Sequence, residues 1–351
     1  MSKRPYRLET RPGIDNTSAK YYLVKQSQID NHRIKVSKFL YSGGLPPSIS
    51  ELEEFRKKYA FDLELKAAEK YSESGIERYQ SKYLSQGRLK LIEQIRYLNK
   101  SFREALTIHE LNGYEKDFEI RYISGTTSIE GNTLTLGETA DLIENDILPN
   151  NKSRREINEV QNFKAVKYYR DHYRKEVSLD FIKNLHAIIM RNIDDESAGY
   201  FRRVDSVVLS GYPGLLTPAI EITNELKKII QFYNERIKEN YHPVEEAILF
   251  HYFFESIHPF SDGNGRVGRE ILNYMLFSDK YPKLLFPKKD RSRYIGALKL
   301  GNSENYKEMV DEFADILIEQ NLEFLHDRTK EMIALPIKEG QRRITDFFND
   351  N

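Results

Sequence analysis

The strongest constraint on this chain is a short polar segment that lies between two apolar helical patterns. It spans residues 258–269 and reads HPFSDGNGRVGR. Apolar residues at helical spacing lead into it from Ala247 to Ile257 and continue after it from Ile271 to Phe277. The sequence therefore predicts two helices joined by a tight loop, with the polar residues gathered at the junction.

The middle of this segment has the composition of an anion site. Gly263, Asn264 and Gly265 allow the backbone to curl so that its N–H groups converge. The N-terminus of the following helix adds a partial positive charge at the same place. Arg266 and Arg269, three residues apart, share a face of that helix and can hold neighbouring phosphates.

Two further residues of the loop could bind a metal ion or accept a proton beside that anion. Asp262 offers hard oxygen ligands suited to Mg²⁺, and His258 can accept a proton near neutral pH. His251 precedes His258 by seven residues, but a third well-spaced ligand is missing, so we do not expect a histidine metal site. These residues predict a loop that holds a polyphosphate beside a base.

The segment resembles the core motif of the Fic family, His-x-Phe-x-(Asp/Glu)-Gly-Asn-Gly-Arg-x-x-Arg, and every fixed position is matched. The resemblance covers about residues 117–317. It implies a mainly α fold, a Fic-type helical bundle with a β-hairpin flap. In this family Phe260 is expected to anchor the loop in the core.

The resemblance also implies an activity: transfer of AMP from ATP to a hydroxyl side chain of a protein target, with Mg²⁺ and with release of pyrophosphate. The implied roles are proton acceptor for His258, Mg²⁺ ligand for Asp262, anion cradle for Gly263, Asn264 and Gly265, β-phosphate contact for Arg266 and γ-phosphate contact for Arg269. Relatives of the Doc type carry lysine at the position of Gly265 and transfer phosphate instead, so Gly265 favours nucleotidyl transfer.

A second motif lies upstream, at Thr126, Glu130 and Gly131. Read by itself, it is a helix end in which Gly131 supplies the left-handed residue. A carboxylate at a helix C-terminus is unfavourable without a cationic partner. The motif resembles the Fic inhibitory sequence (Ser/Thr)-x-x-x-Glu-(Gly/Asn), in which the glutamate pairs with the second arginine of the core motif, here Arg269. Some relatives use the same glutamate to remove AMP. The sequence does not say whether addition or removal of AMP dominates.

Three other segments carry weaker predictions of contacts. Related proteins place adenine contacts near Tyr294 and Asn302, with Asn273 a further candidate; a core tyrosine and a helix cap are the alternatives. Residues 199–214 alternate β-branched residues between glycines, which predicts a hairpin. The resemblance makes this hairpin a flap that registers the target's acceptor segment. The residues assigned to that docking are Val204, Val207 and Leu209.

The whole chain divides into three predicted regions: an N-terminal hairpin and helical region (1–112), a Fic domain with its inhibitory helix (113–333) and a tail (334–351). In the first region we expect strands Tyr21–Lys25 and Ile34–Tyr41, a helix from Ser50 to Tyr71 and a break at Gly75. Helical spacing then continues to Leu111. Further helices are predicted at 117–128, 136–146, 152–173, 179–191, 221–239, 243–257, 265–279, 290–300 and 303–333.

The tail contains a motif of its own. Gln341, Ile344, Phe347 and Phe348 resemble the peptide that docks on DNA sliding clamps of the archaeal and eukaryotic kind. In the alternative interpretation these residues cover the protein's own core. Clamp recruitment suggests a second function, that of a nucleotide-binding adaptor, although the intact His258 favours an enzyme. A phosphotransferase of the Doc type is the third reading.

The composition of the chain limits the functional classes and cellular settings that remain. The net charge is zero over 351 residues, which does not support a general electrostatic grip on nucleic acid. Cysteine is absent, which excludes disulfides and thiolate metal sites and predicts a cytoplasmic setting. No run approaches the ~18 apolar residues of a membrane span. Relatives of this type are often homodimers, and ATP and an unidentified protein are the partners that the resemblance implies.

Overall fold

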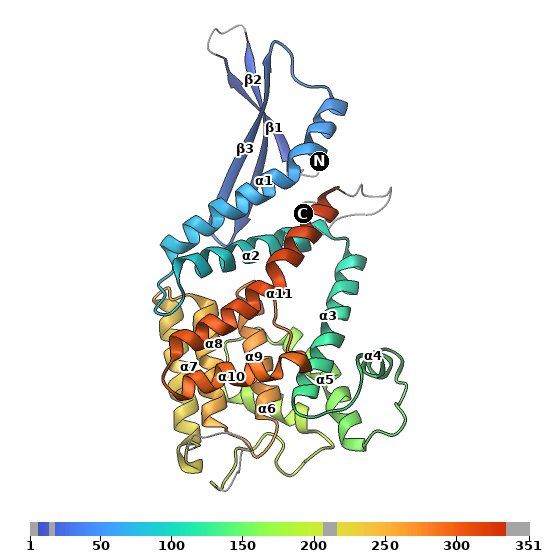
Figure 1. Ribbon diagram of the computed structural model, residues 1–351, viewed down its shortest axis with the longest axis vertical. Coiled ribbons are helices and arrows are strands. Elements are labelled where there is room, and N and C mark those ends of the chain that lie inside the picture. Colours follow the sequence, from blue (N-terminus) through green and yellow to red (C-terminus); the bar gives the residue numbers. More distant parts are fainter. Residues whose placement is uncertain (1–5, 14–17, 206–215, 335–351) are drawn as a thin grey trace. The chain divides into compact units, whose positions relative to one another are not determined.

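The computed structural model describes residues 6–13, 18–205 and 216–334 (Figure 1). Over these residues the chain is mainly helical, as predicted, with eleven α-helices and one small three-stranded sheet. The chain divides into two compact units. The first comprises residues 1–78, 85–114 and 317–351, and the second comprises residues 79–84 and 115–316.

The first unit contains an antiparallel sheet in the order β1-β2-β3. Its strands are β1 (Tyr6–Pro12), β2 (Ala19–Ile29) and β3 (His32–Gly43). The predicted hairpin is confirmed as β2 and β3, but both strands are longer, because Ile29 pairs with His32 across a two-residue turn. Asp30 makes that turn in the left-handed region, at φ 51°. The edge strand β1 was not predicted.

Two long helices accompany the sheet. Helix α1 (Ile49–Arg78) packs against β2, β3 and α2 (Gln86–Ala105). The predicted break at Gly75 is wrong, since α1 continues through it. A Cβ at Gly75 would lie 2.7 Å from Cγ of Glu93 on α2. The glycine therefore serves close helix packing and does not end the helix.

The core of the first unit is aromatic and aliphatic, with one buried carboxylate. Tyr71, Tyr97, Phe102 and Leu325 belong to a single buried cluster. Glu64 is buried beside it and accepts hydrogen bonds from residues of α2, β1 and β2, namely Ser101, Tyr97, Tyr6 and Lys25. These partners satisfy the buried charge, as burial of a carboxylate requires.

The helices that continue the chain carry the site. They are α3 (Ile108–Ile129), α4 (Leu136–Asn145), α5 (Arg154–His172), α6 (Leu179–Met190), α7 (Ile222–Lys238), α8 (Pro243–Ile257), α9 (Asn264–Ser278), α10 (Arg291–Asn302) and α11 (Tyr306–Ala334). Two 3₁₀ turns, Ala219–Glu221 and Lys288–Asp290, precede α7 and α10. Helix α8 packs against both α7 and α9, and α6 packs against α5 and α9.

Local signals set most of these helix ends. Capping boxes at Thr135 with Glu138 and at Ser153 with Glu156 begin α4 and α5. The predicted break between 111 and 117 is wrong, because α2 has already ended at 105 and α3 begins at 108. Thr107 makes the new start, since its hydroxyl accepts from the backbone N–H of Glu110 at 3.3 Å.

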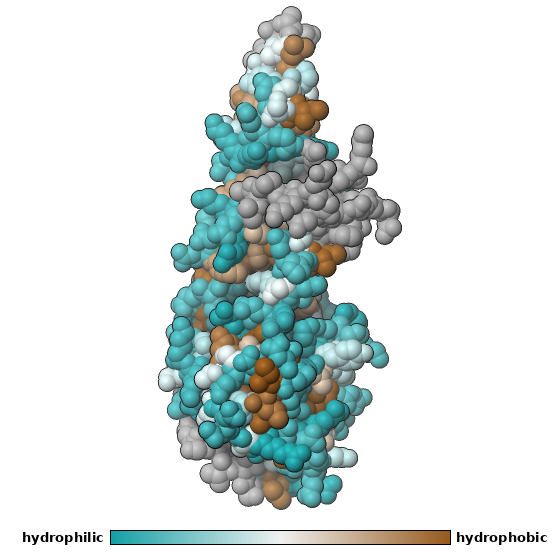
Figure 2. Space-filling model, turned by 90° about the vertical axis from the view of Figure 1, so that its right-hand side faces the viewer, coloured by the Kyte–Doolittle hydropathy of each residue, from teal (hydrophilic) through white to brown (hydrophobic). Residues whose placement is uncertain are grey.

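The surface is predominantly polar. On the face drawn in Figure 2, hydrophilic residues predominate and hydrophobic side chains form small separate groups. Within the described ranges, every helix is too short or too polar to cross a membrane.

Candidate functional site

The predicted loop is formed where α8 meets α9. His258 ends α8 in the left-handed conformation, with φ 49° and ψ 63°. Gly263 precedes α9 at φ 80°, a value that L side chains rarely adopt, so glycine is required there. The first backbone N–H groups of α9 have no partner inside the helix and face outward from its N-terminus. The predicted helix–loop–helix arrangement is therefore present.

Phe260 and Asn264 fix the shape of this loop. Phe260 is fully buried, as predicted. The Asn264 side chain accepts from the Phe260 backbone N–H at 2.9 Å and donates to its carbonyl oxygen at 2.8 Å. Because the amide is engaged in this way, the predicted anion contact of Asn264 rests on its backbone N–H.

His186 on α6 packs against the loop and hydrogen-bonds to it. Its ring stacks on Phe260 with centroids 3.7 Å apart. Nδ1 accepts from the backbone N–H of Gly199 at 2.9 Å, so Nε2 is the protonated nitrogen that donates to the carbonyl oxygen of Asp262 at 3.0 Å. Burial lowers the pKa of His186 to about 4, which keeps the ring neutral in this role.

His258 is half-buried and held by an arginine. Arg202 Nε donates to the His258 carbonyl oxygen at 2.9 Å, and the Arg202 backbone N–H donates to Pro259 at the same distance. Burial and the Arg202 charge lower the pKa of His258 to about 4, against a hydrogen bond to the Glu255 backbone that raises it. The imidazole is therefore neutral near pH 7 and able to accept a proton.

Asp262 stands at the open side of the loop with 42% of its side chain exposed. Burial alone would raise its pKa, but Arg266, Arg155 and the Gly263 N–H together hold the pKa of Asp262 below its usual value. Arg266 Nη2 lies 3.0 Å from Asp262 Oδ1, and Arg155 of α5 contacts the other carboxylate oxygen. The carboxylate is thus kept ionised.

Arg266 is almost fully buried beneath Asp262. Its Nη1 also donates to Glu159 of α5 at 3.2 Å. Its Nε is buried and has no hydrogen-bond partner among the described residues. An anion at the loop would find this guanidinium already oriented by two carboxylates.

Arg269 is held by the end of α3. Its Nη2 donates to Glu130 Oε1 at 2.7 Å and to the Thr126 carbonyl oxygen at 2.8 Å, and its Nε donates to Thr126 Oγ1 at 2.9 Å. Although burial alone disfavours its charge, Glu130 holds the pKa of Arg269 above its ordinary value. The carboxylate at the end of α3 therefore has the cationic partner that the helix dipole demands.

Glycines at two positions make this ion pair possible. Gly131 follows Glu130 at φ 101°, so the chain turns sharply after α3. A Cβ at Gly265 would lie 2.4 Å from Glu130 Oε1 and 2.9 Å from Arg269 Nη1. A side chain at position 265 and the observed place of Glu130 exclude one another.

The candidate adenine contacts lie in different surroundings. Tyr294 is buried, its hydroxyl lies 3.0 Å from His251 Nε2, and its ring stands 5.5 Å from the Arg269 guanidinium carbon. This burial favours a core role over an exposed ring that covers a base. Asn302, the last residue of α10, accepts from Tyr252 at 3.3 Å. Asn273 is fully buried, and its side-chain amide donates to the carbonyl oxygen of Leu284 and accepts from the N–H of Leu284.

The other predicted contact residues are described only in part. Residues 199–205 form no strand, and Val204 is exposed. Val207 and Leu209 lie outside the described residues, as do all four clamp-peptide residues, Gln341, Ile344, Phe347 and Phe348.

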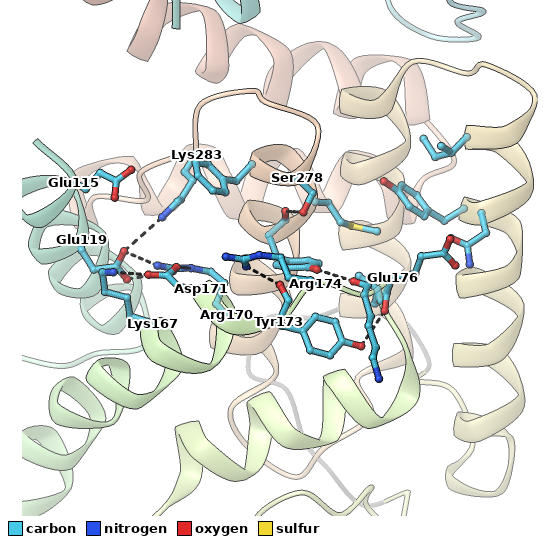
Figure 3. A pocket seen from close by; sticks show the side chains of 18 residues that line it. Glu115, Glu119, Lys167, Arg170, Asp171, Tyr173, Arg174, Glu176, Ser278 and Lys283 are labelled. Atoms are coloured by element: carbon cyan, nitrogen blue, oxygen red, sulfur yellow. Dashed lines mark hydrogen bonds and ion pairs between the residues drawn. The ribbon is translucent and has the colours of Figure 1, made fainter. Parts of the chain in front are cut away.

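A cavity of about 740 Å³ opens at the opposite end of α9 (Figure 3). Its wall includes Ser278, roughly 20 Å along the helix from the loop. Figure 3 shows Arg170 and Lys283 directed at Glu119, with N–O distances of 2.9 and 3.5 Å. Because the cavity lies at the C-terminal end of α9, where the helix dipole disfavours anions, it is a less suitable phosphate site than the loop.

Within the part of the chain that the structure describes, no three histidine or acidic side chains gather as a ready-made metal site. Asp262 alone is compatible with Mg²⁺, since this ion commonly takes one carboxylate, with phosphate oxygens and water as its other ligands. Arg155, the exposed partner of Asp262, also contacts the buried Glu159 at 3.2 Å, and Glu159 keeps Arg266 as a partner if Arg155 moves aside.

Comparison with known proteins agrees with this geometry. Residues 176–276 match the model of the Fic/DOC family. This segment is therefore similar to the Fic/DOC family. It is 34% identical over 225 residues to protein adenylyltransferase Fic of Drosophila ananassae, and 33% identical to that of Drosophila melanogaster. These matches cover 61% of this chain and 44–45% of the relatives, so the chain spans less than half the length of the curated relatives.

Solved structures share the fold. A Fic domain-containing signaling protein from Bacteroides thetaiotaomicron superposes with a TM-score of 0.62 at 25% identity, covering 69% of this chain and 97% of that one. Fic-1 from C. elegans gives a TM-score of 0.60 at 23% identity, covering 80% and 88%.

Several residues of the site were not found from the sequence. Arg155, Glu159, His186 and Arg202 all touch the loop or its arginines, yet each is more than fifty residues away along the chain. The unmatched charge of Arg266 is the one signal that asks for an acidic partner, and it does not say where that partner lies.

Proposed function

We propose that this chain is an auto-inhibited adenylyltransferase that transfers AMP from ATP to a hydroxyl side chain of a protein. The observation that carries the proposal is the ion pair of Arg269 with Glu130, 2.7 Å long, beside a complete anion loop. The similarity to named adenylyltransferases supports the reaction class.

In the proposed reaction the loop holds the triphosphate. The N-terminal N–H groups of α9, including those of Asn264 and Gly265, face the phosphates, and the buried Arg266 supplies a fixed charge beside them. Arg269 takes the terminal phosphate once it is free of Glu130. Positioning and electrostatic stabilisation of this kind supply most of the catalysis in phosphoryl transfer chemistry.

His258 receives the proton of the attacking hydroxyl. It is neutral before the nucleotide binds, and the negative phosphates favour its protonated form as the reaction proceeds. The bond from hydroxyl oxygen to α-phosphorus forms as the bond to pyrophosphate breaks. General base catalysis of this type contributes about 10² to 10⁴-fold in rate.

Asp262 is the residue that would hold Mg²⁺. The ion supplies charge neutralisation on the phosphates and on the leaving pyrophosphate. The depressed pKa of Asp262 keeps it available as an anionic ligand at neutral pH.

Glu130 acts as a brake in this scheme. While it pairs with Arg269, the terminal phosphate lacks that contact and ATP settles with its α-phosphate out of line. A misplacement of about 1 Å can lower the rate about 100-fold. Gly265 supports this assignment over phosphotransfer of the Doc type, since a lysine there would collide with Glu130 in its observed place.

The test compares wild type, Glu130→Gly and the double variant Glu130→Gly/His258→Ala, each incubated with Mg²⁺ and ATP labelled at the α-phosphate. Intact mass then reports added AMP. We expect self-modification to rise about 100-fold in Glu130→Gly and to disappear in the double variant. ATP binding should persist in the double variant, because the imidazole is not a phosphate ligand.

Other outcomes have definite meanings. Equal labelling of wild type and Glu130→Gly would remove the brake from the proposal. Labelling from the γ-phosphate would make the protein a phosphotransferase. Loss of label from a premodified protein, dependent on Glu130, would add AMP removal to its activity.

A further inference from the structure

Glu255 is an acid with 14% of its side chain exposed, and the proposed reaction does not use it. It lies on the last turn of α8, three residues before His258. Its Oε1 is shielded from solvent and has no hydrogen-bond partner among the described residues. A buried oxygen left without a partner is unfavourable, and such an atom in a folded protein calls for an explanation.

The surroundings of Glu255 are charged and tightly packed. Its Oε1 stands 4.0 Å from His251 Nδ1. A Cβ at Gly268 would come within 2.2 Å of the same oxygen, so the glycine next to Arg269 makes room for this carboxyl group. The sequence thus reserves space for an acid beside the arginine that Glu130 restrains.

Glu255 belongs to a cluster of titratable groups that are linked pairwise. The Tyr294 hydroxyl of α10 lies 3.0 Å from His251 Nε2, the Arg269 guanidinium of α9 lies 5.5 Å from the Tyr294 ring, and Glu130, which follows α3, pairs with Arg269 at 2.7 Å. Burial lowers the pKa of His251 to about 3, so it is neutral. Tyr294 is also neutral, since burial raises its pKa. Arg269 and Glu130 are therefore the two charges that act on Glu255.

Those two charges act in opposite directions. Burial raises the pKa of Glu255 to about 8, with Arg269 lowering it and Glu130 raising it. Glu130 already neutralises the charge of Arg269. A second carboxylate would gain little from that arginine, so Glu255 stays protonated. If Glu130 withdraws, the buried guanidinium loses its anionic partner, and a buried charge without a partner is strongly unfavourable.

We infer that Glu255 is a positioning residue for Arg269, a reserve counter-ion that gives its proton to solvent when Glu130 withdraws and then holds the guanidinium beside the loop. The inference rests on the proposed function for its kinetic consequence. Its structural content, a proton on Glu255 that depends on Glu130, stands apart from any activity.

The effect of pH on the balance between the braked and the released state follows from the number of protons that each state binds. The braked state binds one more proton than the released state, because the pKa of Glu255 is higher when Glu130 is in place. Rising pH therefore favours release, by at most about tenfold per pH unit, until the pH passes the higher of the two pKa values. Above that value the balance between the two states becomes independent of this group.

The first experiment observes the proton directly. The infrared carbonyl band of protonated carboxylic acids is followed against pH for wild type and Glu130→Gly, with Glu255→Gln identifying the contribution of Glu255. We expect a band in wild type that titrates near pH 8 and that titrates at least about one pH unit lower in Glu130→Gly. Glu246→Gln is the matched control, since Glu246 is another acid of α8 with a raised pKa but pairs with Arg236.

Glu246→Gln should remove its own signal and leave the Glu130-dependent shift unchanged. A Glu255 band with the same midpoint in wild type and Glu130→Gly would overturn the inference. If Glu255→Gln does not fold, Glu255→Leu provides the same subtraction, because it also removes the carbonyl band of the acid.

The second experiment measures the brake itself. The self-modification rate of wild type is divided by that of Glu130→Gly between about pH 6 and 9, which cancels pH effects common to both proteins. The ratio should rise with pH and level off near pH 8, and it should be flat in the matched pair that carries Glu255→Gln. An equal rise in both pairs would refute the inference, whereas absence of transfer in every protein would reject the proposed function and leave the infrared result to decide this one.

Discussion

The His258 imidazole works at a low pKa before nucleotide binds, because burial and the Arg202 charge both oppose its protonation. A base must be unprotonated to act, so its contribution is present above its pKa and is lost as the pH falls through it. In the proposed complex, the triphosphate would bring negative charge close to the ring and so raise that pKa.

For Glu130→Gly, we therefore expect the two kinetic profiles to differ. The acid limb of kcat/KM for ATP reports the free enzyme and should lie near pH 4, while the acid limb of kcat reports the complex and should lie at higher pH. Self-modification rates against pH at low and saturating ATP measure both. Coincident limbs would mean that the group that titrates does not sense the nucleotide.

The residues that sequence reasoning did find at this site are those that are close together along the chain or that belong to a known motif. His258, Asp262, Arg266 and Arg269 lie within twelve residues, and their chemistry is legible from type and spacing. Glu255 lies only three residues earlier but escaped notice. Its meaning depends on burial and on a missing partner, neither of which a sequence displays.

Among the secondary-structure elements, α3, α5 and α9 meet at a buried ion network. Arg170 of α5 donates to Glu119 of α3 at 2.9 Å and to Glu270 of α9 at 2.8 Å, and all three residues are buried. Glu130 directly follows α3 and Arg269 lies in the second turn of α9, so this network joins the two helices that bring these residues together.

Replacing Arg170 by methionine should lower the free energy of unfolding by about 3–5 kcal/mol, because Glu270 would be left buried without its cation and Glu119 would keep only Lys283. Urea unfolding measures the change. Arg121→Ala is the control: its pair with Asp117 is exposed at an i,i+4 spacing, and its loss should change stability by less than about 0.5 kcal/mol. Similar losses in the two variants would show that burial does not strengthen the Arg170 contacts.

Helix ends set by local chemistry were predicted well, and elements set by distant packing were not. The helix predicted at 152–173 begins within two residues of the observed start of α5, where Ser153 and Glu156 form a capping box. Gly75 gives the same signal in sequence as a helix stop, and only its closeness to Glu93 explains why α1 passes through it. The edge strand β1 has charged residues at alternate positions and ends at Pro12, so it looks like a polar terminus until β2 is beside it.

At the scale of the whole molecule, the match to the Fic/DOC family covers residues 176–276 of the 351-residue chain. Residues 317–334 group with the first unit although they continue the last helix of the Fic region. The tail that follows holds the predicted clamp peptide, and we propose that it recruits the enzyme to a sliding clamp.

Deleting residues 340–351 should abolish association with the clamp and leave self-modification of Glu130→Gly unchanged, since the loop and its arginines lie within residues 258–269. Pull-down with a purified clamp and intact mass are the two measurements. The double substitution Phe347→Ala/Phe348→Ala should reproduce the loss. Clamp association that survives the deletion would dismiss the tail as the docking segment.

The 2.4 Å between a would-be Cβ of residue 265 and the carboxylate of residue 130 also bears on how such chains can diverge. A related chain that gains a side chain at 265 must move the Glu130 carboxylate, the end of a flexible side chain, away from its observed contact with Arg269. A substitution at 265 would therefore alter the loop and its inhibitory contact in a single step.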